Sequence, residues 1–358
     1  MFYSEFMPTT ADAVSDELYN SPFLRACRCE PVPHTPIWLM RQAGRYQPSY
    51  RELRQKISFL ELCKTPELAT KVTVEAVEQT GVDAAIIFSD ILPILEPMGA
   101  SLEYVGGSKP QIHNPVRTAT DIENLRELET AEPLSYVYEA LRQTRRALPA
   151  NIPLIGFCGA PFTLASYLIE GGGSKNYVLT KTLMYRDAGA WNALLSKLSR
   201  ALVKYLNAQI AAGANAVQIF DSWVGCLSPD DYREYVLPHT KFLVENVEKS
   251  VPIIHFGTGT ATLLKMMRDC GDVIGVDWHS NLADAWQTIG LDKAVMGNLD
   301  PVQLFAPREV LLEKARRILE QAAGRNGHIF NLGHGILPET PMNNVIALVD
   351  FVHEVSTR

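Results

Sequence analysis

The chain has 358 residues, of which 47% are hydrophobic, so it is long enough to bury a large core. Its formal net charge is −7, which argues against nucleic acid as its main partner. No apolar run approaches the roughly 18 residues of a membrane span, so we expect no membrane partner either.

The first twenty residues, 1–20, are interpreted as a flexible lead-in. They contain neither the basic block nor the apolar block of a signal peptide, and no Lys or Arg precedes Arg25, unlike in a transit peptide. We therefore expect a cytoplasmic protein. Residues 21–358 contain no repeat, low-complexity segment or linker, so we expect them to form a single domain.

Short apolar runs alternate with helical patterns along the whole chain. Such continuous apolar runs are typical of strands in a parallel sheet that is covered on both faces. In chain order they are the segments 36–40, 82–88, 152–158, 214–220, 251–256, 272–277, 293–297 and 328–333.

Helix signals fill the gaps between these runs. Thr65 and Pro66 begin a predicted helix that ends before Gly81, and Thr120 with Glu123 forms a capping-box pattern. Further helices are predicted at 186–212, from 228 onward, and at 260–270, 283–289, 307–323 and 341–355.

Eight strands that alternate with helices predict the α/β class and a single-domain (β/α)8 TIM-type barrel. A doubly wound open sheet is the alternative fold. No GxGxxG motif follows the first strand, which argues against the dinucleotide-binding version of that alternative.

Polar side chains follow the predicted strands, at the barrel end where active sites lie. They include several arginines, whose guanidinium groups bind carboxylates or phosphates through paired hydrogen bonds. This cluster predicts a multiply charged anion as the substrate. In strand order the residues are Arg41, Gln42 and Arg45; Ser89 and Asp90; Tyr167; Asp221 and Ser222; 257–260; Trp278 and His279; Asn298 and Asp300; and His334.

Some of these polar residues also have a purely structural interpretation. Arg51 lies near the start of a helix, where it is either solvated or paired with Glu52 or Glu61. Asp90 alternatively caps the turn that follows it. His255 sits inside an apolar run, which is typical of a core histidine with satisfied hydrogen bonds.

Motifs for bound metals and cofactors are missing from the sequence. None of the six cysteines forms a CxxC pair, and only Cys27 and Cys29 are close together, which favours reduced structural thiols over a zinc site. The glycine-rich segment 171–175 lacks the spacing of a P-loop. We therefore predict a reaction without a metal or cofactor.

Longer stretches of the sequence resemble the uroporphyrinogen decarboxylase family. MRQAGRY at 40–46, with YRELR at 50–54, resembles the family's N-terminal signature, and GFCGAPFTLASYLIEGGGSK at 156–175 resembles its second signature. The resemblance covers nearly the whole chain from about residue 20. Shorter matches follow in the family's order at 88–92, 218–223, 255–260, 276–280, 297–301 and 331–336.

The resemblance implies a cofactor-independent carboxy-lyase of haem (porphyrin, tetrapyrrole) biosynthesis with a (β/α)8 barrel, working as a homodimer. It implies conversion of uroporphyrinogen III to coproporphyrinogen III, in which four acetate side chains become methyl groups and four CO2 are lost. That substrate carries eight carboxylates. The concentration of arginines in an acidic chain is therefore what such a substrate needs.

The resemblance also implies roles for individual residues. Asp90 would accept hydrogen bonds from the pyrrole N–H groups, and with Arg41 and His334 it forms the predicted catalytic set. The proton donor stays open between Arg41, His334 and a water held by the arginines, because a guanidinium is a poor general acid near neutral pH. The predicted substrate-binding set is Arg41, Gln42, Arg45, Arg54, Asp90, Tyr167, Ser222 and His334, and the backbone of 87–89 is expected in the same pocket.

Two other functions are alternatives to the decarboxylase. Corrinoid-dependent methyltransferases are similar in fold but carry a His-x-Cys zinc motif and a later cysteine. Here the matching positions are 255–257 and 333–335, which contain no cysteine, so the zinc thiolates are missing. The other alternative is a non-catalytic tetrapyrrole carrier, which would not need Asp90 at the centre of the ring.

Overall fold

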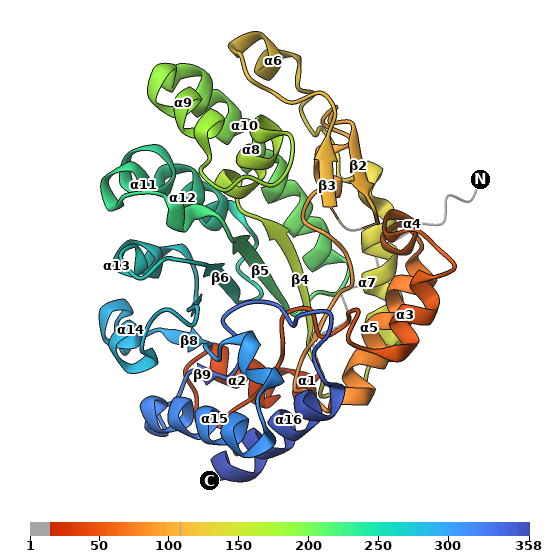
Figure 1. Cartoon of the computed structure of the whole chain (residues 1–358), viewed down its shortest axis with the longest axis vertical. Coiled ribbons are helices and arrows are strands. Elements are labelled where there is room, and N and C mark those ends of the chain that lie inside the picture. The colour runs from red at the N-terminus through yellow and green to blue at the C-terminus, as the bar shows by residue number, and fades with distance from the viewer. Residues whose placement is uncertain (1–14, 108) are drawn as a thin grey trace, which may run out of the picture.

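The computed structural model describes residues 15–107 and 109–358. Seven parallel strands form one curled sheet in the order β1-β4-β5-β6-β7-β8-β9, and helices surround it (Figure 1). The strands are β1 (Ala85–Ile86), β4 (Leu154–Gly159), β5 (Ala216–Asp221), β6 (Ile253–Gly257), β7 (Val273–Gly275), β8 (Ala294–Met296) and β9 (His328–Ile329).

The first predicted strand, at 36–40, closes the ring between β9 and β1. Ile37 forms a parallel bridge with Phe330, and the Phe330 N–H donates to the Pro36 carbonyl at 2.8 Å. On the other side the Asp83 N–H donates to the Ile37 carbonyl at 2.8 Å. The segment keeps only one bridge because the Gln42 side chain takes the Leu39 N–H. The predicted barrel fold is confirmed.

Helices cover the outside of the barrel, and most lie where the sequence predicts them. The longer ones are α5 (Pro66–Thr80), α7 (Ser135–Ala147), α8 (Pro161–Glu170), α9 (Val178–Arg186), α10 (Ala188–Ala211), α12 (Leu237–Asn246), α14 (Leu282–Ile289), α15 (Arg308–Ala322) and α16 (Met342–Ser356). The shorter ones are α1 (Asp16–Tyr19), α2 (Pro22–Cys27), α3 (Pro48–Arg54), α4 (Phe59–Lys64), α6 (Ala119–Asn124), α11 (Pro229–Tyr235) and α13 (Leu264–Met267).

Two local predictions need correction. The capping box of α6 is formed by Thr118 and Asp121, two residues before the predicted pair: the Thr118 hydroxyl accepts from the Asp121 N–H at 3.2 Å. The helix predicted at 260–270 is reduced to α13 and a short 3-10 turn, Arg268–Cys270. A hairpin of β2 (Leu102–Val105) and β3 (Lys109–Ile112) was not predicted at all.

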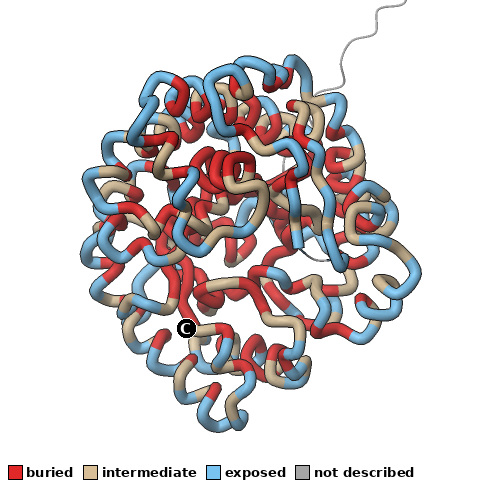
Figure 2. The backbone as a smooth tube through the Cα atoms, turned by 45° about the horizontal axis from the view of Figure 1, so that its top comes forward, coloured by how far each residue is buried: buried red, intermediate tan, exposed pale blue. Residues whose placement is uncertain are grey.

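The predicted lead-in at 1–20 lies mostly outside the described residues, so the division into 1–20 and 21–358 stays a prediction. Within the described part, buried residues concentrate on the strands and on the inner faces of the helices (Figure 2). All six residues of β4 are buried, as its continuous apolar run predicts. Among the described residues, no helix is long and apolar enough to cross a membrane.

Gln209 of α10 supplies the hydrogen bonds that the short strand β1 leaves unmade. β1 pairs only with Leu154 and Ile155 of β4. Farther along β4, the Phe157 N–H donates to Gln209 Oε1 at 2.8 Å, and Gln209 Nε2 donates to the Phe157 carbonyl at 2.9 Å. Gly156 makes this possible, since a Cβ there would lie 2.5 Å from Gln209 Oε1.

We predict that Gln209→Leu lowers the free energy of unfolding by about 2–4 kcal/mol. The substitution leaves two buried backbone groups of Phe157 without partners, and each costs about 1–3 kcal/mol. Gln287→Leu, at an exposed position of α14, is the matched control and is expected to change stability by less than about 0.5 kcal/mol. Urea denaturation of both variants measures the difference, and equal losses would contradict this account.

Candidate active site

A cavity of about 490 Å³ opens at the carboxyl ends of the barrel strands. Its walls come from the loops after 36–40, β1, β4, β5 and β9, together with the β2–β3 hairpin. Of the predicted catalytic and substrate-binding residues, all except Gln42 line it, namely Arg41, Arg45, Arg54, Asp90, Tyr167, Ser222 and His334. The backbone of 87–89 lines it as well, as predicted. Of the other polar residues predicted to follow the strands, Trp278, Asn298 and Asp300 line a separate pocket instead, and Asp221 and His279 line neither.

Two features place the Arg41 side chain in the cavity: the left-handed backbone conformation of Arg41 and the glycine at position 335. Its φ of 62° lies in the left-handed region, which turns the chain sharply after the closing segment. A Cβ on Gly335 would lie 2.6 Å from Arg41 Cγ and 2.9 Å from Arg41 Nε. Glycine at this position therefore gives the arginine its path across the cavity.

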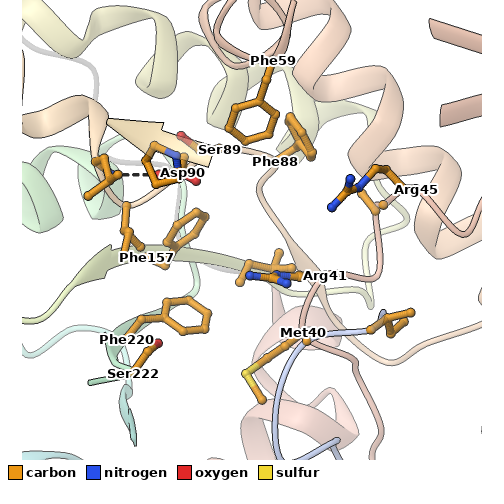
Figure 3. A pocket seen from close by; sticks show the side chains of 18 of the residues that line it. Met40, Arg41, Arg45, Phe59, Phe88, Ser89, Asp90, Phe157, Phe220 and Ser222 are labelled. Atoms are coloured by element: carbon orange, nitrogen blue, oxygen red, sulfur yellow. Dashed lines mark hydrogen bonds between the residues drawn. The ribbon is translucent and has the colours of Figure 1, made fainter. Parts of the chain in front are cut away.

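Arg41 and Arg45 carry guanidinium groups that the described residues leave unpaired. Neither side chain forms an ion pair or a hydrogen bond within residues 15–107 and 109–358. Both are exposed, and Figure 3 shows them extending toward the space beside Phe88, Phe157 and Phe220. Two unpaired cations beside apolar walls favour an anionic ligand with an apolar body.

Arg51 and Arg54 hold the loops of the site rather than pairing with acidic side chains. Arg51 Nη1 donates to the carbonyls of Arg45 and Tyr46 at 2.9 and 3.0 Å, not to Glu52 or Glu61. Arg54 also lines the cavity, and it donates to the Ile57 carbonyl and, at 3.1 Å, to the Gly107 carbonyl of the hairpin turn.

Asp90 combines the two roles that its sequence position suggests. Its Oδ1 accepts from the Leu92 N–H at 2.9 Å, so it caps the turn after β1, and its side chain also faces the cavity (Figure 3). Burial raises the pKa of this carboxyl above its ordinary value, while the hydrogen bonds around it and the charge of Arg41 act in the opposite direction.

Hydroxyl groups and aromatic rings complete the wall near Asp90. The Tyr104 hydroxyl is buried beside Asp90, and burial, followed by the charge of Asp90, raises its pKa. Sequence analysis missed Tyr104 because it lies on the hairpin that was not predicted. Tyr167 stacks on Trp223 with ring centroids 3.9 Å apart.

His334 is neutral in this environment. Burial, followed by the charge of Arg41, lowers its pKa to about 4. Its Nδ1 accepts from the Gly335 N–H at 2.7 Å, so the proton of the neutral ring resides on Nε2. His334 can therefore donate a hydrogen bond to a ligand but carries no positive charge near neutral pH.

Gln42 lies outside the cavity, unlike the other predicted site residues. Its side chain is fully buried, with Oε1 accepting from the Leu39 N–H and Nε2 donating to the Ala84 carbonyl, both at 3.1 Å. It joins the closing segment to β1. The geometry thus gives Gln42 a structural position, and no direct contact with a ligand in the cavity follows from it.

His255 is a core histidine, as its sequence context suggests, but its hydrogen bonds are not satisfied. It is fully buried, and neither ring nitrogen has a hydrogen-bond partner among the described residues. Its Nε2 lies 3.6 Å from Asp221 Oδ2, while Asp221 Oδ1 accepts from the Thr163 hydroxyl at 3.0 Å. Thr163 lines the cavity, so this buried pair lies directly behind its wall.

The fold and the cavity define a (β/α)8 barrel with an arginine-bearing cavity at the end where the active sites of such barrels lie. The model of the family described as Uroporphyrinogen decarboxylase (URO-D) matches residues 18–355, and the chain belongs to this family. This membership confirms the resemblance and the predicted carboxy-lyase activity in tetrapyrrole biosynthesis.

Individual proteins of known name support the same assignment. The uroporphyrinogen decarboxylase of Carboxydothermus hydrogenoformans is 56% identical over 340 residues, which cover 94% of this chain and 97% of that protein. The uroporphyrinogen decarboxylase of Sorangium cellulosum is 57% identical over 335 residues, covering 93% and 96%.

A solved methyltransferase from Methanosarcina mazei superimposes with a TM-score of 0.74, 23% identity and coverage of 93% of this chain and 98% of its own. At that identity it supports the fold alone. Position 257, where a His-x-Cys motif would place its cysteine, is a glycine, and the later loop 333–335 contains no cysteine, so the methyltransferase alternative lacks its ligands.

We predict that Gly335→Ala lowers kcat/KM for decarboxylation by about 100-fold. The added methyl group displaces the Arg41 side chain by about 1 Å, and such a misplacement costs about that factor. Gly173→Ala is the control, because a Cβ there meets nothing within 4 Å. Steady-state kinetics compare the two variants, and wild-type rates in Gly335→Ala would show that the position of Arg41 does not matter.

We also predict that His334 causes no step in the pH profile near the ordinary histidine pKa of about 6.5. Because its pKa is lowered to about 4, the neutral form persists throughout the neutral range. His334→Gln keeps a neutral donor near Nε2 and is therefore expected to keep the shape of the kcat/KM profile throughout the neutral range. Disappearance of a wild-type ionisation near pH 6.5 in this variant would refute the prediction.

Proposed function

We propose that this decarboxylase removes the four acetate carboxyl groups of uroporphyrinogen III and releases coproporphyrinogen III and four CO2. The observation that carries the proposal is one half-buried carboxylate, Asp90, in a cavity that has several aromatic rings in its wall and two unpaired arginines. A macrocycle with four inward N–H groups and eight peripheral carboxylates complements both features.

The arginines bind the periphery of this substrate. Arg41 and Arg45 offer unpaired guanidinium groups, and Arg54 also lines the cavity, where two of its N–H groups donate to carbonyls. Arg51 acts through the loop, since it fixes the carbonyl of Arg45. A local cluster of cations focuses a polyanion even when the protein is acidic overall.

Asp90 stabilises the reacting ring. Protonation of a pyrrole α-carbon gives a cationic iminium, which accepts the electron pair released when the acetate C–C bond breaks and CO2 leaves. The resulting methylene then takes a proton and becomes methyl, while the ring returns its own. A carboxylate fixed beside the pyrrole nitrogens favours the cation without reorganising, an effect of about 3–4 kcal/mol.

Three groups compete for the role of proton donor: Arg41, His334 and a water held by the arginines. Arg41 has the position and the charge, but a guanidinium releases its proton with difficulty. His334 is neutral and presents its Nε2 proton.

The homodimer and the cytoplasmic location expected from the sequence are likewise proposals. Sedimentation of the purified protein tests the homodimer, and localisation of a tagged chain tests the cytoplasmic location.

Anaerobic incubation with uroporphyrinogen III, without added metal or cofactor, tests the proposed reaction. Products are oxidised and separated by carboxylate number. Stepwise formation of seven-, six-, five- and four-carboxylate porphyrins is the expected result. Binding without loss of CO2 would instead identify a carrier. The absence of both binding and turnover would overturn the proposal.

We predict that Asp90→Asn lowers kcat/KM at neutral pH by about 10²–10³-fold, the usual loss when a preorganised electrostatic partner is removed. Because the pKa of Asp90 is raised, its carboxylate, and with it the activity, is lost as pH falls through a value above the ordinary 3.8. This acid limb should vanish in Asp90→Asn.

The exposed Asp230→Asn is the matched control and should retain both the rate and the acid limb. Rates measured over the acid range in both variants give the comparison. An unchanged acid limb in Asp90→Asn would assign that ionisation to another group.

A further inference from the structure

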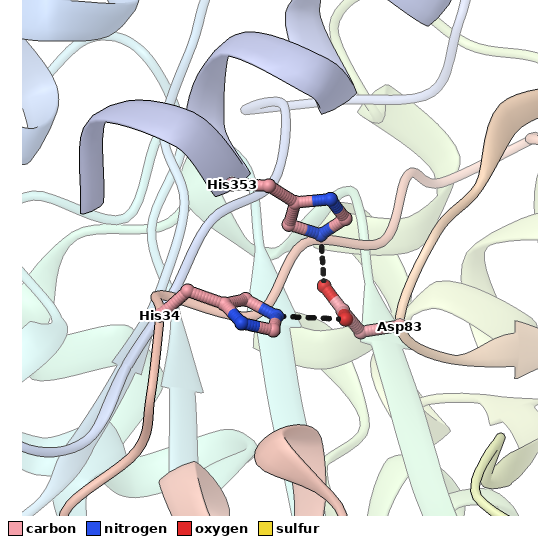
Figure 4. Close-up of side chains that lie close together, drawn as sticks. All are labelled: His34, Asp83 and His353. Atoms are coloured by element: carbon pink, nitrogen blue, oxygen red, sulfur yellow. Dashed lines mark hydrogen bonds and ion pairs between the residues drawn. The ribbon is translucent and has the colours of Figure 1, made fainter. Parts of the chain in front are cut away.

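Three metal-binding side chains converge at the barrel end opposite the cavity. His34 precedes the closing segment 36–40, Asp83 precedes β1, and His353 lies on α16 near the end of the chain (Figure 4). His34 Nε2 lies 3.1 Å from Asp83 Oδ1, and His353 Nε2 lies 2.8 Å from Asp83 Oδ2. One ligand atom from each residue lies within 4.8 Å of the others.

We propose that His34, Asp83 and His353 form a binding site for Zn²⁺, separate from the active site. Two imidazole nitrogens and one carboxylate are a common zinc ligand set, and water completes the coordination. The three side chains are 25%, 13% and 29% exposed, so an ion from solvent can reach them and one position stays open.

The three side chains lie near the spacing of a zinc site. Ligand atoms about 2.0–2.2 Å from a tetrahedral zinc lie about 3.3 Å from one another. The two nitrogen–oxygen distances fall within about half an ångström of that spacing, each to a different oxygen of Asp83, and the ligand atoms draw together from the 4.8 Å within which they lie. Binding replaces the two imidazole–carboxylate hydrogen bonds, and each histidine then coordinates through Nε2 after losing the proton there.

A backbone hydrogen bond holds the carboxylate in place for this role. The Ile37 N–H donates to Asp83 Oδ2 at 2.7 Å, which fixes the orientation of the group toward both rings. Such second contacts typically orient metal ligands and raise their affinity. The two imidazole rings pack edge to face with centroids 4.7 Å apart, so each ring limits the rotation of the other.

The donor set selects the type of ion. Ca²⁺ and Mg²⁺ prefer sites made of oxygen ligands, whereas imidazole suits Zn²⁺ and its transition-metal neighbours. No thiol belongs to the cluster. Co²⁺ is a useful probe because it accepts the same ligands and its absorption reports coordination number and thiolate ligation.

Occupation of this site would link the segment before the first strand to the last helix, α16. The Thr35 N–H already donates to the Ser356 hydroxyl at 2.8 Å, and the Arg358 N–H donates to the Pro33 carbonyl at 2.9 Å. A metal bound by His34 and His353 adds a third and stronger link between the closing segment and α16. The ion would therefore stabilise the fold rather than take part in decarboxylation.

Zinc titration of the chelator-treated full-length chain tests the proposal. We expect one Zn²⁺ per chain and a rise of about 5 °C in the unfolding midpoint at a hundredfold excess over Kd. His34→Gln and His353→Gln each keep a hydrogen-bond donor toward Asp83 but remove a ligand, and each should weaken zinc binding at least tenfold. His113→Gln is the control, because His113 pairs with Glu103 alone.

The outcome is read without any activity measurement, so failure of this proposal is distinguishable from failure of the proposed function. No rise in the unfolding midpoint of the wild-type chain, or equal zinc affinity in both variants and in the control, would overturn it. If the variants do not fold, the Co²⁺ spectrum of the wild-type chain decides. Four-coordinate bands without a thiolate transition support the site, and a thiolate transition overturns it.

Discussion

The Asp90 carboxylate lies in a cavity walled largely by aromatic rings, where a charge is costly unless hydrogen bonds or an opposite charge compensate it. Within the protein the Leu92 N–H and the charge of Arg41 provide that compensation, and burial still keeps the pKa of Asp90 above its ordinary value. In the proposed reaction, the cationic ring formed during catalysis adds the opposite charge that the protein provides only in part. Asp90 therefore acts on the catalytic step more than on substrate binding.

The rest of the barrel can be understood as support for that arrangement. The left-handed backbone at Arg41 and the absence of a side chain at Gly335 allow the guanidinium to cross the cavity. Gln42 faces the opposite way and joins the closing segment to β1. Adjacent residues of one signature, Arg41 and Gln42, therefore face opposite sides, the cavity and the barrel wall.

The sequence predicts the barrel well because continuous apolar runs mark buried parallel strands, and polar residues after those runs must meet at one end. The same reasoning brings Arg41, Asp90 and His334 together. It fails for Tyr104, whose short, half-exposed hairpin has no strong apolar pattern, and for Gln42, because neighbouring polar residues of a turn point to opposite sides. His34 and His353 meet only through the tertiary fold.

The comparison of kcat and KM in Asp90→Asn and Arg45→Gln tests the central claim most directly. If Asp90 stabilises the cationic ring and Arg45 binds the carboxylate periphery, Asp90→Asn lowers kcat with little change in KM. Arg45→Gln then raises KM with little change in kcat. The account is contradicted if both variants lose kcat equally, or if Asp90→Asn changes KM alone.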